Sequence, residues 1–348
     1  MKSLITELFR RRTLNEAGLA ALLGTLRVED EAFLYEQARR VQHSVYGRNI
    51  YFRGLIEFTS FCKNDCYYCG LRRSNGNAQR YRLTEDQILA CCSRGYALGF
   101  RTFVLQGGED AYFDDEKLCR IISAIHRKYP DCAITLSVGE RSRESYRTLR
   151  DAGAERYLLR QETSDPAHYR LLHPEPLTIE NRKRCLWDLK ELGYQVGCGI
   201  MIGAPGQTAN HILQDLHFMQ ELQPDMIGIG PFIPHHDTPF CNKPSGTLTE
   251  TLHLLAILRL MFPEALLPST TALGTIDPLG REKGILAGAN VIMPNLSPSD
   301  VRGKYLLYDG KPHVDEEINR NFFDLNQRIN SIGYRVCVSR GDRYGFRA

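Results

Sequence analysis

Hydrophobic and polar residues follow two different patterns along the chain, with a change near residue 49. Before that point, apolar residues recur at helical spacing in three short amphipathic segments. Thr13 followed by Glu16 is typical of a capping box at the start of the second segment. We therefore expect residues 1–48 to form a helical extension that packs on the main body. The three predicted helices are 5–11, 16–26 and 29–46.

Beyond residue 49, short apolar segments alternate with longer segments of helical periodicity. Parallel sheets whose faces are covered by helices produce this alternation. The strands are expected at 50–58, 102–106, 132–137, 156–160, 195–202, 226–232, 265–269 and 290–293. The helices between them are expected at 84–98, 114–128, 143–152, 178–192, 208–221, 247–261 and 280–287.

The number of these strand–helix units favours one architecture. Eight units match the usual length of a closed (β/α)8 barrel better than that of an open sheet. We therefore predict the α/β class, with a (β/α)8 TIM barrel over residues 49–295. A C-terminal extension at 296–348 is expected to pack on the barrel. The alternative is a partial barrel that lacks the last strands.

Glycine and polar residues directly follow most of the predicted strands. In a barrel these loops gather at one end, and active sites are built there. The sequence therefore predicts a functional site at the carboxyl ends of the strands. The segments concerned are 107–110, 137–140, 160–163, 203–206, 231–238, 270–271 and Asn295.

Composition and charge exclude several classes of protein. The chain has 348 residues, 43% of them hydrophobic and 24% charged, which is typical of a globular protein with a sizeable core. A net charge of +3 does not indicate a nucleic-acid or membrane partner. The N-terminus does not resemble a secretory signal, and no apolar segment approaches the roughly 18 residues of a membrane span. We expect a soluble, cytoplasmic protein.

Eleven cysteines are a high number for such a chain. A disulfide framework is not expected in a long chain without an export signal. Three of the cysteines stand close together, as Cys62, Cys66 and Cys69. We interpret the others as small buried hydrophobic residues. These are Cys91, Cys92, Cys119, Cys132, Cys185, Cys198, Cys241 and Cys337.

The three clustered cysteines predict a metal site with one open coordination position. No fourth cysteine or histidine follows at the spacing of a closed tetrahedral site. Zinc is one alternative, with a fourth ligand from a distant residue such as His173, His235 or His236. Three thiolates in a loop at the barrel mouth fit an iron–sulfur cube with one open iron better.

Cys-x3-Cys-x2-Cys, with Tyr68 directly before the last cysteine, resembles the signature of the radical S-adenosylmethionine superfamily. The resemblance implies a [4Fe–4S] cluster held by Cys62, Cys66 and Cys69, with S-adenosylmethionine at the open iron. An electron from the cluster would cleave this cofactor to a 5′-deoxyadenosyl radical. Gly107-Gly108-Glu109 resembles the family segment that holds the methionine amino group of the cofactor.

Further segments resemble the HydE family of [FeFe]-hydrogenase maturases, from about residue 30 to about residue 310. The distinctive residues of biotin synthase and methylornithine synthase are not found. Some HydE proteins carry additional C-terminal cysteines for an accessory cluster, whereas residues 311–335 here contain none. We therefore expect a single cluster. The matching segments are 56–59, 69–73, 80–84, 157–160, 162–163, 180–182, 228–235 and 290–295.

The resemblance also assigns roles to polar residues that follow the strands. Glu162 and Arg182 correspond to a pair that holds the methionyl end of the cofactor. A carboxylate suits an ammonium or sulfonium, and an arginine binds a carboxylate with two hydrogen bonds. The alternative is a surface ion pair at two helix starts. Ser137 and Glu140 are expected near the ribose or the adenine.

Arg160, Thr270 and Thr271 are predicted to point into the barrel. One positive charge and two hydroxyls would make a small anion pocket, suited to cyanide or carboxylate groups on an iron complex. For the threonines, a satisfied interior hydrogen-bond network is the alternative. Tyr305 resembles a tyrosine that lies near the substrate cavity.

The resemblance implies a maturase that acts on a small cysteine-bound iron carbonyl/cyanide complex during assembly of the hydrogenase di-iron site. It also implies an electron donor such as a ferredoxin or flavodoxin, and contacts with other maturases. Two alternatives stay open at this point. One is a HydE-like paralogue that acts on another amino-acid-derived substrate, and the other is a non-catalytic carrier or scaffold for iron complexes.

Overall fold

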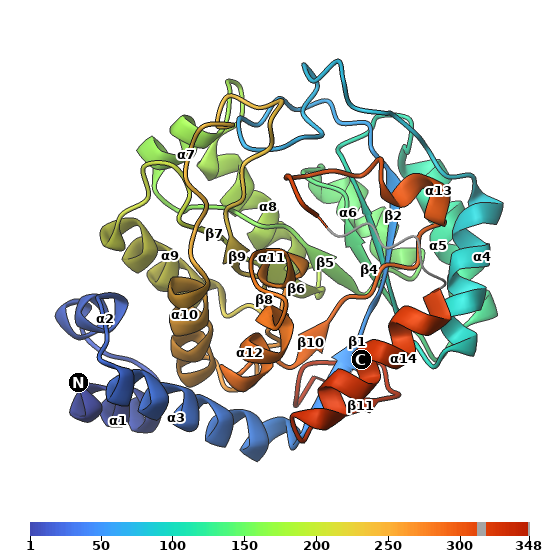
Figure 1. Ribbon diagram of the computed structural model, residues 1–348. Coiled ribbons are helices and arrows are strands. Elements are labelled where there is room, and N and C mark those ends of the chain that lie inside the picture. Colours follow the sequence, from blue (N-terminus) through green and yellow to red (C-terminus); the bar gives the residue numbers. More distant parts are fainter. Residues whose placement is uncertain (312–317, 347–348) are drawn as a thin grey trace.

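Parallel strands lie at the centre of the molecule, with helices around them and the N-terminal helices along one edge (Figure 1). The structure is a computed structural model and describes residues 1–311 and 318–346. Six strands pair in parallel in the order β2-β3-β4-β5-β6-β8. They are β2 (Gly54–Thr59), β3 (Thr102–Gly107), β4 (Ala133–Ser137), β5 (Arg156–Leu158), β6 (Gln195–Cys198) and β8 (Met226–Ile227).

Isolated bridges close this sheet into a barrel. The seventh strand, predicted at 265–269, is present only as such bridges, and the eighth contains β10 (Val291–Ile292). β10 also pairs with β1 (Asn49–Phe52), which precedes β2 in the chain. The predicted closed barrel is therefore confirmed, and the partial barrel is wrong. The closing bridges are Met226–Leu266, Pro268–Val291 and Leu55–Asn295.

Two of the predicted strands are interrupted by glycines. β6 and β8 are each followed by a short separate strand, β7 (Met201–Ile202) and β9 (Gly230–Pro231), which pair with each other. A Cβ atom at Gly199 would lie 1.9 Å from the carbonyl oxygen of Gly228. The backbones approach so closely here that only glycine fits.

The outer helices begin and end where local signals predict. α4, for example, begins with a capping box, in which Thr84 and Gln87 each accept a hydrogen bond from the other's backbone. The short helix α11 was not predicted. The helices are α4 (Glu85–Ala97), α5 (Asp115–Lys128), α6 (Arg143–Asp151), α7 (Pro166–Leu172), α8 (Ile179–Glu191), α9 (Ala209–Leu222), α10 (Leu248–Met261), α11 (Thr271–Ile276) and α12 (Gly280–Leu286).

The first three helices form a layer against the barrel wall, and α3 packs along α10. Figure 1 shows α3 running beneath the barrel toward β1. The predicted capping box of the second helix is wrong, because Asn15, not Thr13, caps it by accepting a hydrogen bond from the Gly18 N–H at 2.8 Å. The helices are α1 (Lys2–Arg11), α2 (Glu16–Leu23) and α3 (Val28–Tyr46).

The C-terminal extension returns to the amino end of the barrel. Its last strand, β11 (Arg335–Cys337), pairs in parallel with β1. The following tail lies below the barrel, where Arg156 donates hydrogen bonds to the Arg340 carbonyl at 2.8 Å and to Asp342 at 2.5 Å. This end of the barrel is therefore closed by the chain itself. The extension also contains α13 (Ser299–Arg302) and α14 (Ile318–Ser331).

Five of the eight scattered cysteines are buried, as the sequence predicts, whereas Cys241 is exposed and Cys119 and Cys337 are partly exposed. The interpretation as buried hydrophobic residues is therefore wrong for Cys241, which lies in the loop before α10. All eleven cysteines are free. No helix in the described part of the chain is long and apolar enough to cross a membrane.

Candidate functional site at the carboxyl end of the barrel

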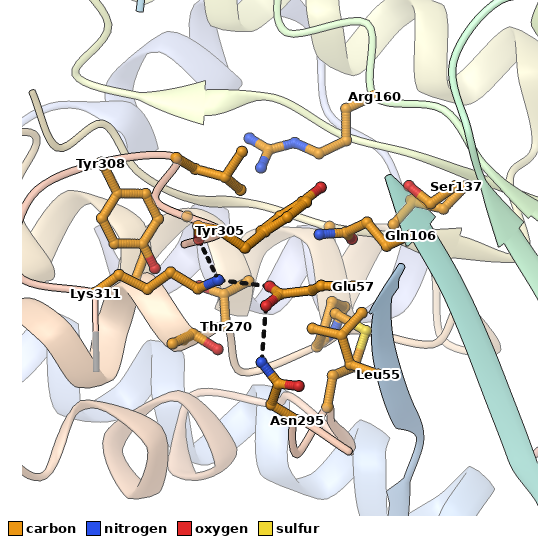
Figure 2. Close-up of a pocket in the computed structure, with 18 of the residues that line it drawn as sticks. Leu55, Glu57, Gln106, Ser137, Arg160, Thr270, Asn295, Tyr305, Tyr308 and Lys311 are labelled. Carbon is orange, nitrogen blue, oxygen red and sulfur yellow. Dashed lines mark hydrogen bonds and ion pairs between the residues drawn. The ribbon is translucent and has the colours of Figure 1, made fainter. Parts of the chain in front are cut away.

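A cavity of about 640 Å³ lies inside the barrel, toward the carboxyl ends of the strands. It reaches from the cysteine loop to the C-terminal extension. Figure 2 shows polar side chains from several strands pointing into it. Every predicted site residue except Glu140 lines this cavity. Those residues are Cys62, Cys66, Tyr68, Cys69, Gly107, Gly108, Glu109, Ser137, Arg160, Glu162, Arg182, Thr270, Thr271 and Tyr305.

The cysteine loop is held to the barrel by its own polar residues. Asp65 accepts two hydrogen bonds from Arg72, at 2.9 and 2.7 Å, and two more from Ser74. Arg80 donates to four backbone carbonyls around the loop. Gly70 packs against His235, since a Cβ atom there would lie 2.3 Å from the ring. These contacts therefore hold the loop in one shape against the barrel.

The loop meets the end of β3 without room for a side chain. A Cβ atom at Gly108 would lie 2.2 Å from the Phe61 carbonyl oxygen and 2.7 Å from Cβ of Cys62. The next backbone N–H, of Glu109, points at the Cys62 sulfur at 3.4 Å. The glycine at 108 thus lets a backbone donor approach the first thiol.

The spacing of the three thiols separates an iron–sulfur cube from a single metal ion. A tetrahedral zinc ion holds its thiolates about 3.8 Å apart, given Zn–S bonds of about 2.3 Å. Within the described residues, the only His, Cys, Asp or Glu trio with ligand atoms all within 4.8 Å of one another is His235, His236 and Asp309. The three thiols are therefore spread too widely for one ion, and they suit a larger cube.

The three histidines considered as a fourth zinc ligand have other surroundings. His173 is buried, and burial lowers the pKa of its ring to about 3. Its two ring nitrogens face the Tyr68 hydroxyl at 3.2 Å and the Tyr169 carbonyl at 3.1 Å. The rings of His235 and His236 stack at 4.3 Å with planes 20° apart, and both group with Asp309 and not with the thiols. These positions favour structural roles.

Burial is the main influence on the pKa values of the three thiols. It raises the pKa of Cys62 and Cys66, and it raises the pKa of Cys69 to about 12. The neighbouring cysteines act in the same direction on Cys66 and Cys69. Cation binding removes this penalty, because thiolates are the ligands and their protons leave when the metal binds.

The side chain of Glu109 packs directly against the backbone of Gly139. A Cβ atom at Gly139 would lie 2.0 Å from the Glu109 side chain. One carboxylate oxygen accepts a hydrogen bond from the Glu140 N–H at 3.1 Å. The other oxygen is buried without a hydrogen bond and lies 3.2 Å from the Lys63 ammonium. This oxygen is available to a cationic group in the cavity.

Glu162 and Arg182 both line the cavity, but each pairs with a different residue. Arg182 donates to Glu140 at 2.6 Å and to the Arg160 carbonyl at 2.9 Å. Glu162 lies 3.0 Å from Arg160, without the alignment of a hydrogen bond. Glu162 and Arg182 are 8% and 9% exposed, so the alternative of a surface ion pair is wrong.

Glu162 is held in an unusual backbone conformation. Its φ angle of +65° lies in the left-handed region, where a side chain costs about 1–3 kcal/mol. Burial raises the pKa of its carboxyl group, and the charges of Arg160 and Arg182 oppose this change. Strain and a buried charge together are typical of a functional position.

The predicted anion pocket has unpaired donors. Nε and Nη2 of Arg160 and the hydroxyl of Thr270 are buried without a hydrogen-bond partner. A satisfied interior network is therefore wrong for Thr270. Tyr305 is buried beside them, and burial followed by the Glu57 charge raises the pKa of its hydroxyl. Figure 2 shows Arg160 and Thr270 on opposite sides of the Tyr305 region.

Sequence reasoning missed a buried ion pair in the same cavity. The Lys311 ammonium lies 2.5 Å from Glu57 of β2 and 2.8 Å from the Tyr305 carbonyl. Asn295 donates to the second Glu57 oxygen at 2.8 Å (Figure 2). Glu57, a second charged residue after Arg53 in the mostly apolar segment 50–58, was an available signal. Its partner is 254 residues away, and no local pattern could have found it.

Comparisons with known proteins match this geometry. The family model of the radical SAM superfamily matches residues 56–219. The "[FeFe] hydrogenase maturase subunit HydE" of Thermotoga maritima is 44% identical over 312 residues, which cover 89% of this chain and 86% of that protein. The 3-methylornithine synthase of Methanosarcina acetivorans is 29% identical, over 92% of this chain and 89% of its own.

A solved structure gives the same fold. The crystal structure of methylornithine synthase (PylB) superposes with a TM-score of 0.84 at 27% sequence identity, covering 96% of this chain and 97% of that one. This chain is thus an iron–sulfur enzyme of the radical S-adenosylmethionine class, which uses a [4Fe–4S] cluster and cleaves S-adenosylmethionine. Within that superfamily it belongs to the HydE family, as the segments after its strands predict.

Proposed function

We propose that this protein acts as an [FeFe]-hydrogenase maturase, on a small cysteine-bound iron carbonyl/cyanide complex, during assembly of the di-iron site. One observation carries this proposal. A single cavity joins three thiols at its mouth to Arg160, whose Nε has no partner beside its ion pair with Glu162, and to the unpaired Thr270 hydroxyl deeper inside. The 44% identity to a HydE protein over most of the chain supports the same activity.

We assign the cofactors to the residues that fit them. Cys62, Cys66 and Cys69 would hold the cluster, with the Glu109 N–H donating to the first sulfur. When bound, the cluster and S-adenosylmethionine supply the 5′-deoxyadenosyl radical. The glycines at 107 and 108 let the end of β3 pack closely against Thr59 and the cysteine loop, because a Cβ atom at either position would collide with them.

The buried charges near the thiols suit the groups of S-adenosylmethionine. The unpaired oxygen of Glu109 would accept from the methionine ammonium, and Arg182 would contact the carboxylate. Glu162 carries a negative charge that favours the sulfonium. Glu140 contacts Arg182 and does not line the cavity, so we assign it to positioning that arginine. Tyr68 and Ser137 complete the cofactor wall.

The deeper residues would select the substrate. Arg160 and Thr270 offer unpaired donors to an anionic group, while Thr271 and Tyr305 border the same space. Cyanide ligands and a cysteine carboxylate are anionic, so a cysteine-bound iron complex has the charge that these donors require. Orientation within the cavity then brings the substrate sulfur toward the cofactor end.

Anaerobic reconstitution with iron and sulfide tests the enzyme assignment. We expect an absorbance band near about 400 nm, and 5′-deoxyadenosine after reduction in the presence of S-adenosylmethionine. Cys66→Ser should lose both signals. Cys241→Ser is the matched control, because Cys241 is exposed and outside the cavity. A Cys66→Ser protein that still produced 5′-deoxyadenosine would refute the ligand assignment.

A second candidate substrate class comes from the relatives. The 29% identity to a 3-methylornithine synthase favours an amino-acid-derived substrate as the alternative. Two buried ion pairs in the cavity, Arg160–Glu162 and Lys311–Glu57, suit a zwitterion. Maturation of an apo-hydrogenase in vitro, compared with formation of 3-methylornithine, decides between the two. Activity in the second assay alone would contradict the maturase proposal.

We further propose a ferredoxin or flavodoxin as the electron donor, other maturases as partners, and the cytoplasm as the location. Eleven free cysteines support a reducing compartment. We also propose a division into an N-terminal extension at 1–48, the barrel at 49–295 and a C-terminal extension at 296–348. The start of β1 at Asn49 supports the first boundary.

A further inference from the structure

The outer surface of the cysteine loop contains an arginine stacked between two aromatic rings. The guanidinium carbon of Arg82 lies 3.9 Å from the ring centre of Phe61 and 4.7 Å from that of Tyr112. Tyr112 is exposed, whereas Phe61 is partly buried and directly precedes Cys62, the first of the clustered cysteines. Figure 1 shows the chain between β2 and α4 as loops at the upper edge of the molecule. The stack therefore leads from solvent to a residue next to a cluster ligand.

The ion pairs on this surface have their cations on the outside. Arg82 donates two hydrogen bonds to Asp110, at 2.7 and 2.9 Å, and its side chain is 36% exposed while that of Asp110 is 4% exposed. Lys63 pairs with Glu109 in the same orientation, with side chains that are 60% and 10% exposed. Each pair is neutral as a whole, but its positive member faces solvent. An approaching protein therefore meets a positive potential here.

Arg73 adds a cation without a counter-charge. Its backbone N–H donates to the Asn64 carbonyl at 2.8 Å, which places it beside Lys63 in the same loop. Arg73 is exposed, and within residues 1–311 and 318–346 no carboxylate pairs with it. We call the exposed residues Lys63, Arg73, Arg82 and Tyr112 the loop patch.

The positive charge of the loop patch does not continue onto the neighbouring helices. On α4 and α5, side chains of both signs pair with each other at the surface, so these helices extend no positive field. The pairs concerned are Lys117–Asp114 and Arg120–Glu85.

Electron entry is the function that suits this position. Cleavage of S-adenosylmethionine consumes one electron from the cluster, and the rate of electron transfer falls steeply with distance. Lys63 follows Cys62 in the chain and Phe61 precedes it, so a protein bound to the loop patch lies close to a cluster ligand. The cavity side of the thiols is the place assigned to the cofactor. A protein carrier must therefore approach from the outer side of the loop.

We propose that the loop patch is the docking surface for an acidic flavodoxin that reduces the cluster. Acidic side chains on the carrier complement the outward cations. The exposed ring of Tyr112 favours a flavodoxin, because the flavin presents an apolar ring edge at its surface. The anionic, two-electron-reduced flavin gives one electron to the oxidised cluster and becomes a neutral radical, so no proton has to move. That the docked carrier serves turnover rests on the function proposed above, whereas the docking itself does not.

Equilibrium binding of an acidic flavodoxin to the reconstituted protein tests the docking surface without turnover. Arg73→Glu and Tyr112→Ala should each raise the Kd at least about 10-fold, through a reversed charge and a lost aromatic contact. Tyr112→Phe keeps the ring and should bind like the wild type, whose affinity should fall as salt is added. Arg127→Glu is the matched control, because Arg127 is an exposed arginine in the last turn of α5, remote in sequence from the loop.

Three results would contradict the proposal. A flavodoxin Kd that is unchanged in both Arg73→Glu and Tyr112→Ala overturns the docking surface. A Kd raised as much by Arg127→Glu shows that net charge alone acts, and it overturns the surface as well. If these variants change the Kd of a ferredoxin but not that of the flavodoxin, the choice of carrier is wrong.

Turnover with two reductants tests whether docking delivers the electron. With reduced flavodoxin at low concentration, 5′-deoxyadenosine formation by Arg73→Glu should fall by the same factor as its affinity. With dithionite, a small reductant that needs no docking surface, its rate should equal that of the wild type. An equal fall with both reductants places the effect on the cluster and overturns the assignment. If the wild type makes no 5′-deoxyadenosine with dithionite, the proposed function fails, and the Kd values still decide the docking surface.

Discussion

Buried arginines occur at both ends of this barrel, and the two ends use them differently. At the amino end, Arg53 and Arg156 are 2% exposed, and the space beside them is only about 10 Å³. Such a space is at the lower limit for a single water molecule. At the carboxyl end, Arg160 and Arg182 border a cavity of about 640 Å³.

The partners of these arginines also differ. At the amino end, Arg156 pairs with Asp342 of the C-terminal tail, and Arg53 donates to Met226 and to the Gly341 carbonyl. Both of these guanidinium groups leave Nε without a partner. A buried arginine with an unpaired nitrogen therefore does not by itself mark a binding site. A binding site is marked instead by polar atoms without partners that border an open cavity.

Mutations at the amino end and at the carboxyl end of the barrel should therefore change different properties of the protein. Substitutions at the carboxyl end are expected to change cofactor content or affinity. Substitutions at the amino end are expected to change the free energy of unfolding. The variants of Gly108, Asp342 and Arg182 below would weaken this division if they changed the other quantity instead.

The largest effect is expected for Gly108→Ala. The new Cβ atom would lie 2.2 Å from the Phe61 carbonyl, so the cysteine loop must shift away from β3. We expect loss of the bound iron and at least about a 1,000-fold loss of S-adenosylmethionine cleavage, because misplaced ligands do not hold a cluster. Iron analysis and 5′-deoxyadenosine formation measure these losses.

Gly76→Ala is the control for this variant. Gly76 belongs to the same loop region, and a Cβ atom there meets nothing within 4 Å. It should retain iron and activity. Full iron content in Gly108→Ala would show that the close approach of β3 is not needed for the cluster.

The next largest effect is expected at the opposite end, for Asp342→Ala. Removal of this carboxylate leaves Arg156 buried without its ion-pair partner, which typically costs about 3–5 kcal/mol. Denaturant unfolding measures the loss. The affinity of the folded protein for S-adenosylmethionine should stay at the wild-type value. A lower affinity without a loss of stability would contradict the division between the two ends.

The same pair predicts a pH dependence. Burial opposes ionisation of Asp342, but Arg156 and its other partners hold the pKa of Asp342 well below its usual value of 3.8. A depressed pKa means that the stabilisation is present above the unfolded-state pKa and is lost as the pH falls through and below it. Acid unfolding of the wild type should therefore be steeper than that of Asp342→Asn.

The sequence predicts the parts of this site that depend on local patterns. The cysteine loop, the Gly107–Glu109 turn and each strand end are continuous segments of the sequence. The spacing of residues within each segment is therefore enough to predict it. The pairing of charges does not follow from spacing. Arg182 pairs with Glu140 and not with Glu162, because the pairing depends on the distance between neighbouring strand ends in the folded barrel.

Long-range and irregular features were missed for related reasons. The Glu57–Lys311 pair joins residues 254 positions apart. Helix α11 has only six residues, too few for a periodic pattern to show. Boundaries of the barrel strands were predicted well where the strand is a continuous apolar run, as in β4.

A smaller effect is expected for Arg182→Lys. Lysine keeps the charge but cannot contact Glu140 and the Arg160 carbonyl at once with the planar geometry of a guanidinium. We expect the Kd for S-adenosylmethionine to rise about 100-fold, equivalent to about 2.7 kcal/mol, with little change in unfolding. Equilibrium binding to the reconstituted protein measures it.

Arg184→Lys is the matched control for this change. Arg184 lies on the same helix and pairs with Asp188 at the surface, where its side chain is 46% exposed. Its affinity for the cofactor should equal that of the wild type. If Arg182→Lys bound S-adenosylmethionine as tightly as Arg184→Lys, the assignment of Arg182 to the cofactor carboxylate would fail.

The smallest effect is expected for Asp215→Asn, beneath the loop that carries Arg160 and Glu162. Asp215 is fully buried on α9 near Ser164 and Gln161, and burial raises the pKa of its carboxyl group to about 7. A raised pKa means that the stabilising protonated form is lost as the pH rises through about 7. Wild-type stability should therefore fall by about 2 kcal/mol between about pH 5.5 and about pH 8.5, relative to Asp215→Asn. If the stabilities of the two proteins changed with pH in the same way, the Asp215 carboxyl group would not titrate in this range, and its raised pKa would be refuted.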